Sequence, residues 1–201
     1  FDVDGVAAIL SASPYYNKPS QEGIYQHYAA LSAASPLPLI LYNVPGRTSS
    51  NISAQTTIRL AKNFGNIIAI KEASGNLDQI TEILLERPVD FQVLSGDDNL
   101  TFAMMALGAE GVISVSGQGV PEVFCAMVHH MIEGKWIQAR TAHLSIYDLT
   151  NQLFEEGNPV GIKALLEARG IAEATVRLPL VEATSNLKNT LAASLEILNL
   201  S

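Results

Sequence analysis

The stretch that decides the fold runs from Leu37 to Lys71 and reads LPLILYNVPGRTSSNISAQTTIRLAKNFGNIIAIK. It contains two short apolar runs, of which the first ends in Tyr42 and the second in Lys71. An amphipathic helical pattern separates them. Neighbouring parallel strands that each end in a reactive side chain bring both groups to the same end of a barrel or sheet. We therefore expect Tyr42 and Lys71 to lie side by side.

The position of Lys71 suggests imine chemistry. Apolar strand neighbours disfavour the ammonium form by desolvation, and a free amine can attack a carbonyl carbon. Two ordinary interpretations remain open at this point. A lysine at a strand end can simply extend its amino group into water. A tyrosine at a strand end more often packs half-buried against its neighbours than takes part in chemistry.

Short apolar runs recur on both sides of this stretch, and they predict strands at residues 6–11, 37–42, 66–71, 91–95 and 111–115. Helical patterns lie between them at residues 20–34, 53–62, 77–86 and 99–107, with Ser20, Ser53 and Asp98 as predicted N-caps. Nearly continuous apolar strands that alternate with amphipathic helices indicate an α/β fold, in which helices cover a parallel sheet.

Beyond Val115 the sequence predicts only helices, at residues 121–133, 136–154, 159–169 and 185–199, with Gly134 and Gly170 as stops. Five strands fit either an open doubly wound sheet or part of an eight-stranded barrel. The chain starts at Phe1 without an initiating Met and soon enters a strand, whereas a complete barrel takes about 250 residues. We expect a partial TIM barrel at residues 1–120, holding about the last five strands, and C-terminal helices at 121–201.

Composition narrows the class of protein. The 201 residues are 48% hydrophobic and 16% charged, which predicts a folded chain with a large core. The apolar runs are far shorter than the roughly 20 residues that cross a bilayer. A net charge of −8 argues against nucleic acid as a partner, because binding phosphates requires clustered Lys and Arg. We expect no membrane association.

Cysteine usage points to the cytoplasm. Cys125 is the single cysteine in the sequence and cannot form an internal disulfide, which fits a reducing compartment. No Cys/His cluster has the spacing of zinc ligands. Because free cysteine usually behaves as a small apolar residue, we expect Cys125 to be buried in its helix.

Five motifs follow one another through essentially the whole chain: SPYYNKPS at 13–20, YNVPGRT at 42–48, IKEA at 70–73, LSGDD at 94–98 and GVISV at 111–115. In this order they resemble the dihydrodipicolinate synthase family of pyruvate-dependent class I aldolases. The resemblance implies a TIM barrel lyase that condenses pyruvate with L-aspartate 4-semialdehyde in lysine (diaminopimelate) biosynthesis, as a homotetramer built from dimers. It implies no metal and no organic cofactor.

The resemblance also implies roles for individual residues. Lys71 would form the imine with pyruvate, and Tyr42 would donate and accept protons. Tyr16 matches a tyrosine that the neighbouring subunit contributes to this proton relay. Arg47 matches the group that binds the carboxylate of the incoming aldehyde, where a guanidinium can form two parallel hydrogen bonds.

Two further positions match backbone that lines the pyruvate site. These are Gly96, where a missing side chain allows close approach, and Ile113. The adjacent Asp97 and Asp98 suggest a metal site at first sight, but two carboxylates at a helix start are more simply capping groups.

The match is incomplete at the N-terminal side. The family's Gly-Thr-Thr-Gly-Glu segment, which binds the pyruvate carboxylate and supplies a relay threonine, is absent from the sequence. We therefore expect little synthase activity from these residues alone. Tyr15 matches one contributor to the family's lysine-inhibition site, whose other residues are mostly missing, so feedback by lysine stays open.

Two alternatives remain. The first is another pyruvate-dependent aldolase, such as N-acetylneuraminate lyase or a keto-sugar-acid aldolase, although Arg47 and Tyr16 fit the synthase more directly. The second is a non-catalytic assembly module, because a five-stranded sheet has two unpaired edges that invite pairing with another chain.

Overall fold

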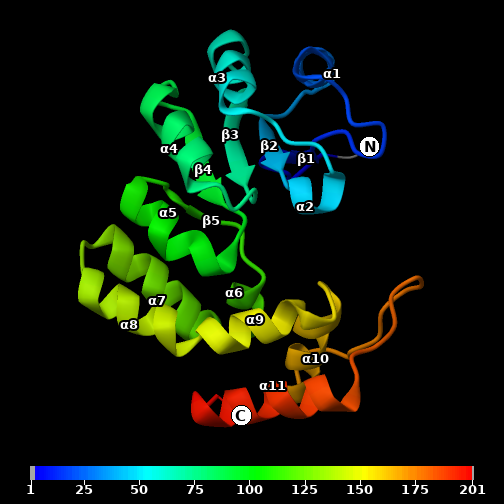
Figure 1. The fold of residues 1–201 in the computed structure, drawn as a ribbon, viewed down its shortest axis with the longest axis vertical. Coiled ribbons are helices and arrows are strands. Elements are labelled where there is room, and N and C mark those ends of the chain that lie inside the picture. Colours follow the sequence, from blue (N-terminus) through cyan, green and yellow to red (C-terminus); the bar gives the residue numbers. More distant parts are fainter. Residues whose placement is uncertain (1–2, 201) are drawn as a thin grey trace. The chain divides into compact units, whose positions relative to one another are not determined.

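Five strands form one parallel sheet in the computed structural model, which describes residues 3–200 (Figure 1). The strands are β1 (Ile9–Ala12), β2 (Leu39–Asn43), β3 (Ile67–Glu72), β4 (Gln92–Ser95) and β5 (Gly111–Val112). Their spatial order follows the chain order, so each strand pairs with the next one along the sequence. The prediction of an α/β fold with a parallel sheet is confirmed.

The chain divides into two compact units, Phe1–Ile113 and Ser114–Ser201. The first unit contains the whole sheet and the helices α1 (Gln21–Ala34), α2 (Pro45–Thr48), α3 (Ala54–Asn63), α4 (Leu77–Glu86) and α5 (Thr101–Leu107), with a 3-10 turn η1 (Asp98–Leu100) before α5. Helices α1, α3, α4 and α5 pack in succession along one face of the sheet (Figure 1). Apolar side chains of the strands, among them Leu41, Ile70 and Val93, are fully buried beneath these helices.

Hydrogen-bonding caps set the starts of the two helices that flank β2. The Ser20 hydroxyl accepts from the Gly23 amide before α1, and the Ser53 hydroxyl accepts from the Thr56 amide before α3. Each cap satisfies an amide that has no partner within its helix. Both N-caps agree with the sequence-based prediction.

Within residues 114–200 of the second unit, all the regular elements are helices. They are α6 (Ser116–Gly119), α7 (Pro121–Ile132), α8 (Trp136–Ser145), α9 (Tyr147–Glu155), α10 (Val160–Ala168) and α11 (Ser185–Ile197). Gly134 and Gly170 follow α7 and α10 with φ angles of 72° and 67°, a left-handed conformation that glycine adopts without strain. The two predicted stops are confirmed.

Four predicted boundaries are wrong. The strand expected over residues 6–11 is observed at Ile9–Ala12. The single helix expected over residues 136–154 is interrupted at Ile146, where the backbone leaves helical geometry while the side chain is buried. The strand expected over residues 111–115 has only two strand residues. A 3-10 turn precedes α5, so the capping carboxylate is that of Asp97, which accepts from the Asn99 amide, rather than that of Asp98.

Cys125 is exposed, which contradicts the expectation that it is buried. Helix α7 buries Phe124, Met127 and Met131, which share one face at a spacing of three and four residues. Cys125 follows Phe124 by one residue and so points about 100° away from that face. The Cys125 side chain therefore lies on the solvent-exposed side of α7.

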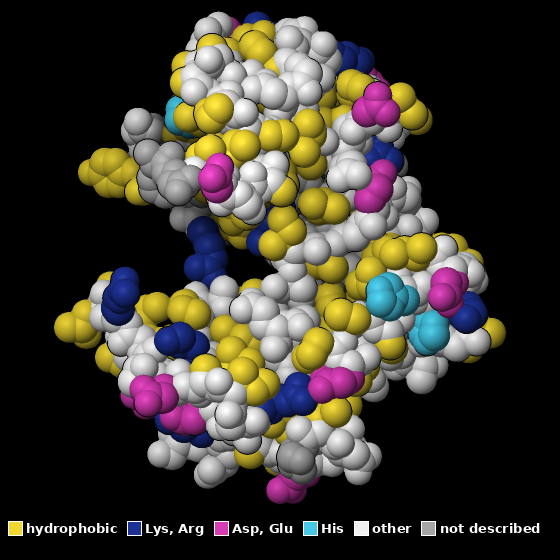
Figure 2. Space-filling model, turned by 180° about the vertical axis from the view of Figure 1, so that it is seen from behind, with side chains coloured by type: hydrophobic (Ala, Val, Ile, Leu, Met, Phe, Trp, Pro, Cys, Tyr) yellow, Lys and Arg dark blue, Asp and Glu magenta, His cyan; other side chains and the backbone are white. Residues whose placement is uncertain are grey.

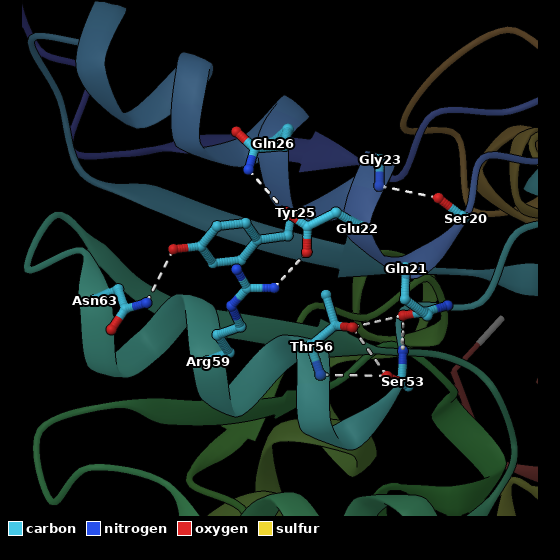
Figure 3. Close-up of polar contacts among 10 residues, drawn as sticks. All are labelled: Ser20, Gln21, Glu22, Gly23, Tyr25, Gln26, Ser53, Thr56, Arg59 and Asn63. Carbon is cyan, nitrogen blue, oxygen red and sulfur yellow. Dashed lines mark hydrogen bonds and ion pairs between the residues drawn. The ribbon is translucent and has the colours of Figure 1, made fainter.

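A surface network joins α1 to α3 (Figure 3). The guanidinium of Arg59 lies 3.5 Å from the ring centroid of Tyr25 and 2.5 Å from a carboxylate oxygen of Glu22. The Asn63 amide also donates to the Tyr25 hydroxyl at 2.9 Å. Both partners of the ion pair are about half exposed, so it contributes little to stability. The network connects α1 and α3 at their surface.

Several of the Lys and Arg side chains drawn in Figure 2 lie beside acidic ones. The ion pairs of the described residues include Arg59, Arg87, Lys135, Arg169 and Lys188. Each of these basic side chains therefore has an acidic partner, and the excess of acidic residues leaves the net charge negative. Among residues 3–200, no helix is long and apolar enough to cross a lipid bilayer.

Close contact between α9 and α10 generates a stability prediction. A Cβ atom at Gly161 would overlap the backbone of Leu153, whereas nothing lies within 4 Å of the corresponding position at Gly46 in α2. Gly to Ala normally stabilises a helix by about 1 kcal/mol. We expect Gly161→Ala instead to lower the free energy of unfolding by about 2 kcal/mol, because backbone must move. Denaturant unfolding measures both variants, and a Gly161→Ala protein at least as stable as Gly46→Ala would contradict the packing.

Candidate active site

The register of β2 and β3 places Tyr42 directly opposite Lys71. Side chains of paired residues on neighbouring strands point to the same side of the sheet. The amino nitrogen of Lys71 lies 4.4 Å from the centroid of the Tyr42 ring, within the range of a cation–π contact. The two side chains therefore meet as the strand ends predict.

Burial acts on both groups. Lys71 is partly buried, and desolvation lowers its pKa, while the negative charge of Asp98 raises the pKa and the positive charge of Arg47 lowers it. Burial also raises the pKa of Tyr42, an effect that Arg47 opposes. At neutral pH the phenol therefore keeps its proton, and the lysine releases its proton more easily than a solvated lysine does.

Gly96 lies directly against the stem of Lys71. A Cβ atom at Gly96 would stand 2.9 Å from Cε of Lys71 and 2.9 Å from Cβ of Ala73, closer than Cβ atoms come to other atoms. The Gly96 amide donates to the Glu72 carbonyl at 2.8 Å. The absence of a side chain here leaves the space that Lys71 occupies.

Ile113 follows β5 and stays attached to the sheet, since its amide donates to the Ser95 carbonyl at 2.9 Å. It is partly buried. The structure thus aligns Ile113 and Gly96 with the carboxyl ends of neighbouring strands, and their roles in substrate binding stay predictions.

Arg47 belongs to the short helix α2, which directly follows β2 and begins with Pro45 at its first position. Its side chain is exposed. The hydroxyl of Thr48 donates to the Ser50 carbonyl at 2.8 Å and ties the end of α2 to the next loop. Arg47 is therefore close enough to influence Lys71 and Tyr42 electrostatically, while its guanidinium remains accessible to a ligand.

Tyr16 is not brought to Lys71 and Tyr42 by the described part of this chain. It lies in the loop after β1 with a φ angle of 67°, and 91% of its surface is exposed. The neighbouring Tyr15 is 71% exposed. The sequence resemblance assigns Tyr16 to the site of another subunit, and that assignment stays a prediction.

The sequence analysis missed three residues at this end of the sheet. Asp98, expected only as a cap, is buried and influences Lys71 through its charge. Asn43 and Glu72 are fully buried and hydrogen-bonded to each other across β2 and β3. One signal was available, because Glu72 lies two residues after the buried Ile70 and so on the same face of β3, where a carboxylate needs a partner. Within residues 3–200, no three His, Cys, Asp or Glu side chains are arranged to hold a metal ion.

Comparison with known proteins identifies the family of this chain. The family model described as "Dihydrodipicolinate synthetase family" matches residues 1–198. The chain belongs to this family. It is 53% identical, over 180 residues, to the 4-hydroxy-tetrahydrodipicolinate synthase of Phocaeicola vulgatus; the aligned part covers 90% of this chain and 61% of that protein.

Solved synthase structures show the same fold. The dihydrodipicolinate synthase of Aquifex aeolicus superposes with a TM-score of 0.94 at 41% identity, over 98% of this chain and 67% of that one. The chloride-inhibited enzyme of Acinetobacter baumannii was solved in complex with pyruvate. It superposes with a TM-score of 0.93 at 38% identity, over 98% of this chain and 67% of that one. The five strands and their helices thus correspond to part of a family TIM barrel, and the chain spans about three fifths of the length of the Phocaeicola relative.

Because the pKa of Lys71 is lowered, we expect replacement of this lysine to stabilise the protein by an amount that depends on pH. The folded state binds this proton less tightly than the unfolded chain, whose lysine pKa is near the ordinary value of about 10.4. Stability of the native protein therefore rises with pH between the lowered folded pKa and the unfolded pKa, and the full penalty applies below that window. We expect Lys71→Met to be more stable than the native protein at about pH 7, with a difference that shrinks towards about pH 10.

Denaturant unfolding across this pH range measures the effect. Lys62→Met serves as the matched control, because Lys62 is an exposed lysine on α3. A constant difference between Lys71→Met and the native protein at every pH would show that Lys71 is not desolvated.

Proposed function

We propose that this chain carries the pyruvate-activating chemistry of a 4-hydroxy-tetrahydrodipicolinate synthase, a lyase that condenses pyruvate with L-aspartate 4-semialdehyde in lysine biosynthesis. The observation that carries the proposal is the placement of the Lys71 amino group against the Tyr42 ring at paired strand ends. Family membership supports it, and so does the synthase name of the Phocaeicola relative, which is not that of a sugar-acid lyase.

In this proposal the neutral amine of Lys71 attacks the keto carbon of pyruvate, and the resulting carbinolamine loses water to give a protonated imine. The imine withdraws electrons, so a proton leaves the pyruvate methyl group and an enamine forms. The enamine carbon then bonds to the aldehyde carbon of the second substrate, which re-forms the protonated imine, and the aldehyde oxygen takes up a proton to become a hydroxyl group. Water finally cleaves the imine and restores the Lys71 amine. The lowered pKa of Lys71 favours the first step, and the reaction needs no metal or organic cofactor.

Tyr42 is the proposed proton carrier. Its phenol stays protonated at neutral pH because burial raises its pKa, so it first acts as a donor to the departing hydroxyl of the carbinolamine. A group with so high a pKa needs partners to take the proton onward. We assign that task to Tyr16 of a neighbouring copy in a homotetramer built from dimers.

Arg47 is the proposed binding group for the carboxylate of L-aspartate 4-semialdehyde. Its exposed guanidinium sits on α2, directly after the strand that carries Tyr42, so a carboxylate held there places the aldehyde near Lys71. The backbone at Gly96 and Ile113 would line the pyruvate on the other side. An enzyme of lysine biosynthesis with a single cysteine fits the cytoplasm.

Borohydride trapping tests the imine directly. We expect intact-mass spectrometry to show one reduced pyruvyl adduct on the native chain and on the control Lys62→Met after incubation with pyruvate and borohydride. Lys71→Met should show no adduct, because the nucleophile is gone. A folded native chain without adduct, or an adduct that survives Lys71→Met, would contradict the proposal.

Proton exchange tests the role of Tyr42. An enamine in deuterated water replaces the methyl hydrogens of pyruvate with deuterium, which proton NMR records. We expect Tyr42→Phe to keep the trapped adduct but to slow this exchange by about 100-fold, the usual effect of losing a general acid or base. The matched control is Tyr25→Phe, whose ring lies on α1 in the network of Figure 3. Equal exchange rates in the two variants would remove Tyr42 from the relay.

A further inference from the structure

The residues that follow the proposed catalytic pair also form a pair. Asn43 lies opposite Glu72 in the register of β2 and β3, one position beyond Tyr42 and Lys71. Successive side chains of a strand point to opposite faces, so Asn43 and Glu72 are on the side away from the lysine. Both are completely buried.

Glu72 is a buried carboxylate that only hydrogen bonds compensate. The Asn43 amide donates to its two oxygens at 3.2 and 3.0 Å, the Gln79 amide donates at 3.1 Å, and the Ser74 backbone amide donates at 2.7 Å. Within residues 3–200, none of the Lys, Arg or His side chains forms an ion pair with it. Removing any one donor would leave part of a buried charge unsatisfied, which is costly.

Asn43 extends the network to the loop before α3. Its carbonyl oxygen accepts from the Ile52 amide at 2.9 Å, and its amide nitrogen also lies 2.8 Å from the side-chain oxygen of Asn51. A single cluster therefore links the ends of β2 and β3 with α4, through Gln79, and with the loop that leads into α3. These are the elements that determine where Tyr42 and Lys71 stand.

We propose that the Asn43–Glu72 pair positions Lys71 for imine formation by locking the ends of β2 and β3 in register. Glu72 and Asn43 contact no reacting atom. They act through the backbone that joins them to Lys71 and Tyr42. The inference rests on the proposed function for the reaction that Lys71 performs, but the placement of the lysine is measurable without it.

The chemistry of the pair explains why a carboxylate is needed. An ionised carboxylate only accepts hydrogen bonds, so the amide groups of Asn43, Gln79 and Ser74 must all turn their N–H groups towards it. A glutamine at position 72 would direct its own amide at one of these donors. The hydrogen bonds around Glu72 therefore stabilise one arrangement of the strand ends relative to others.

The test measures the pKa of Lys71 by trace labelling with acetic anhydride over a range of pH, read at each lysine by mass spectrometry. The exposed Lys62 is the internal reference. In the native chain we expect Lys71 to label at lower pH than Lys62. In Glu72→Gln and in Asn43→Asp, Lys71 leaves its place against Tyr42 and becomes solvated, so its unprotonated fraction at about pH 8 should fall about threefold.

The reciprocal double variant Asn43→Asp with Glu72→Gln restores one donor and one acceptor with the partners exchanged. We expect it to recover most of the lost labelling of Lys71, which a general loss of stability would not allow. Gln79→Met removes one donor to Glu72, and also the acceptor of the Asn51 amide, from a partly buried position, and should shift labelling in the same direction by a smaller factor. This milder variant keeps the test valid if a single change at position 43 or 72 prevents folding.

Glu110→Gln is the control for stability. Glu110 lies directly before β5; its carboxylate accepts from the Val93 amide of β4 at 2.8 Å and pairs with Arg87. We expect it to lower stability without changing the labelling of Lys71. Unchanged labelling in folded Glu72→Gln, Asn43→Asp or Gln79→Met protein, or no recovery in the double variant, would overturn the inference. A native chain with labelling as expected but without a pyruvate adduct would contradict only the proposed function.

Discussion

The pairing of β2 with β3 is the constraint on which the rest of the site depends. It sets Tyr42 opposite Lys71 and Asn43 opposite Glu72, and so produces a reactive pair on one face of the sheet and a buried polar pair on the other. The side-chain period of a strand is two residues, so a slip of one position would carry Lys71 into the apolar layer and turn Glu72 to the opposite side. The hydrogen bonds from Asn43 to Glu72 depend on this register, because the two residues come from different strands.

The pleat of β3 also separates two opposite charges that are neighbours in the chain. If Lys71 and Glu72 shared a face, the carboxylate would hold the ammonium form and oppose any role as a nucleophile. Their placement on opposite faces leaves the charge of Asp98 to favour the proton on Lys71, while burial and Arg47 act against it. The balance of these effects, rather than any single contact, decides how readily the amine is free.

The sequence predicted the sheet well because its apolar runs are short, β-rich and separated by amphipathic helices with serine caps, as at Ser20 and Ser53. It failed where no residue type marks the event. The interruption at Ile146 carries neither glycine nor proline, and the 3-10 turn before α5 moves the cap from Asp98 to Asp97. The meeting of Tyr42 and Lys71 followed from topology, whereas the partners of Glu72 come from β2, α4 and a loop, so no local pattern could reveal them.

Gly96 limits which substitutions the site can accept during evolution. Any side chain at this position competes for the volume that the stem of Lys71 fills, so a substitution there displaces the lysine before it can reshape the pocket wall. Adaptation to a new substrate would have to come from the opposite wall, where the exposed Arg47 on its short helix can be exchanged without disturbing the sheet.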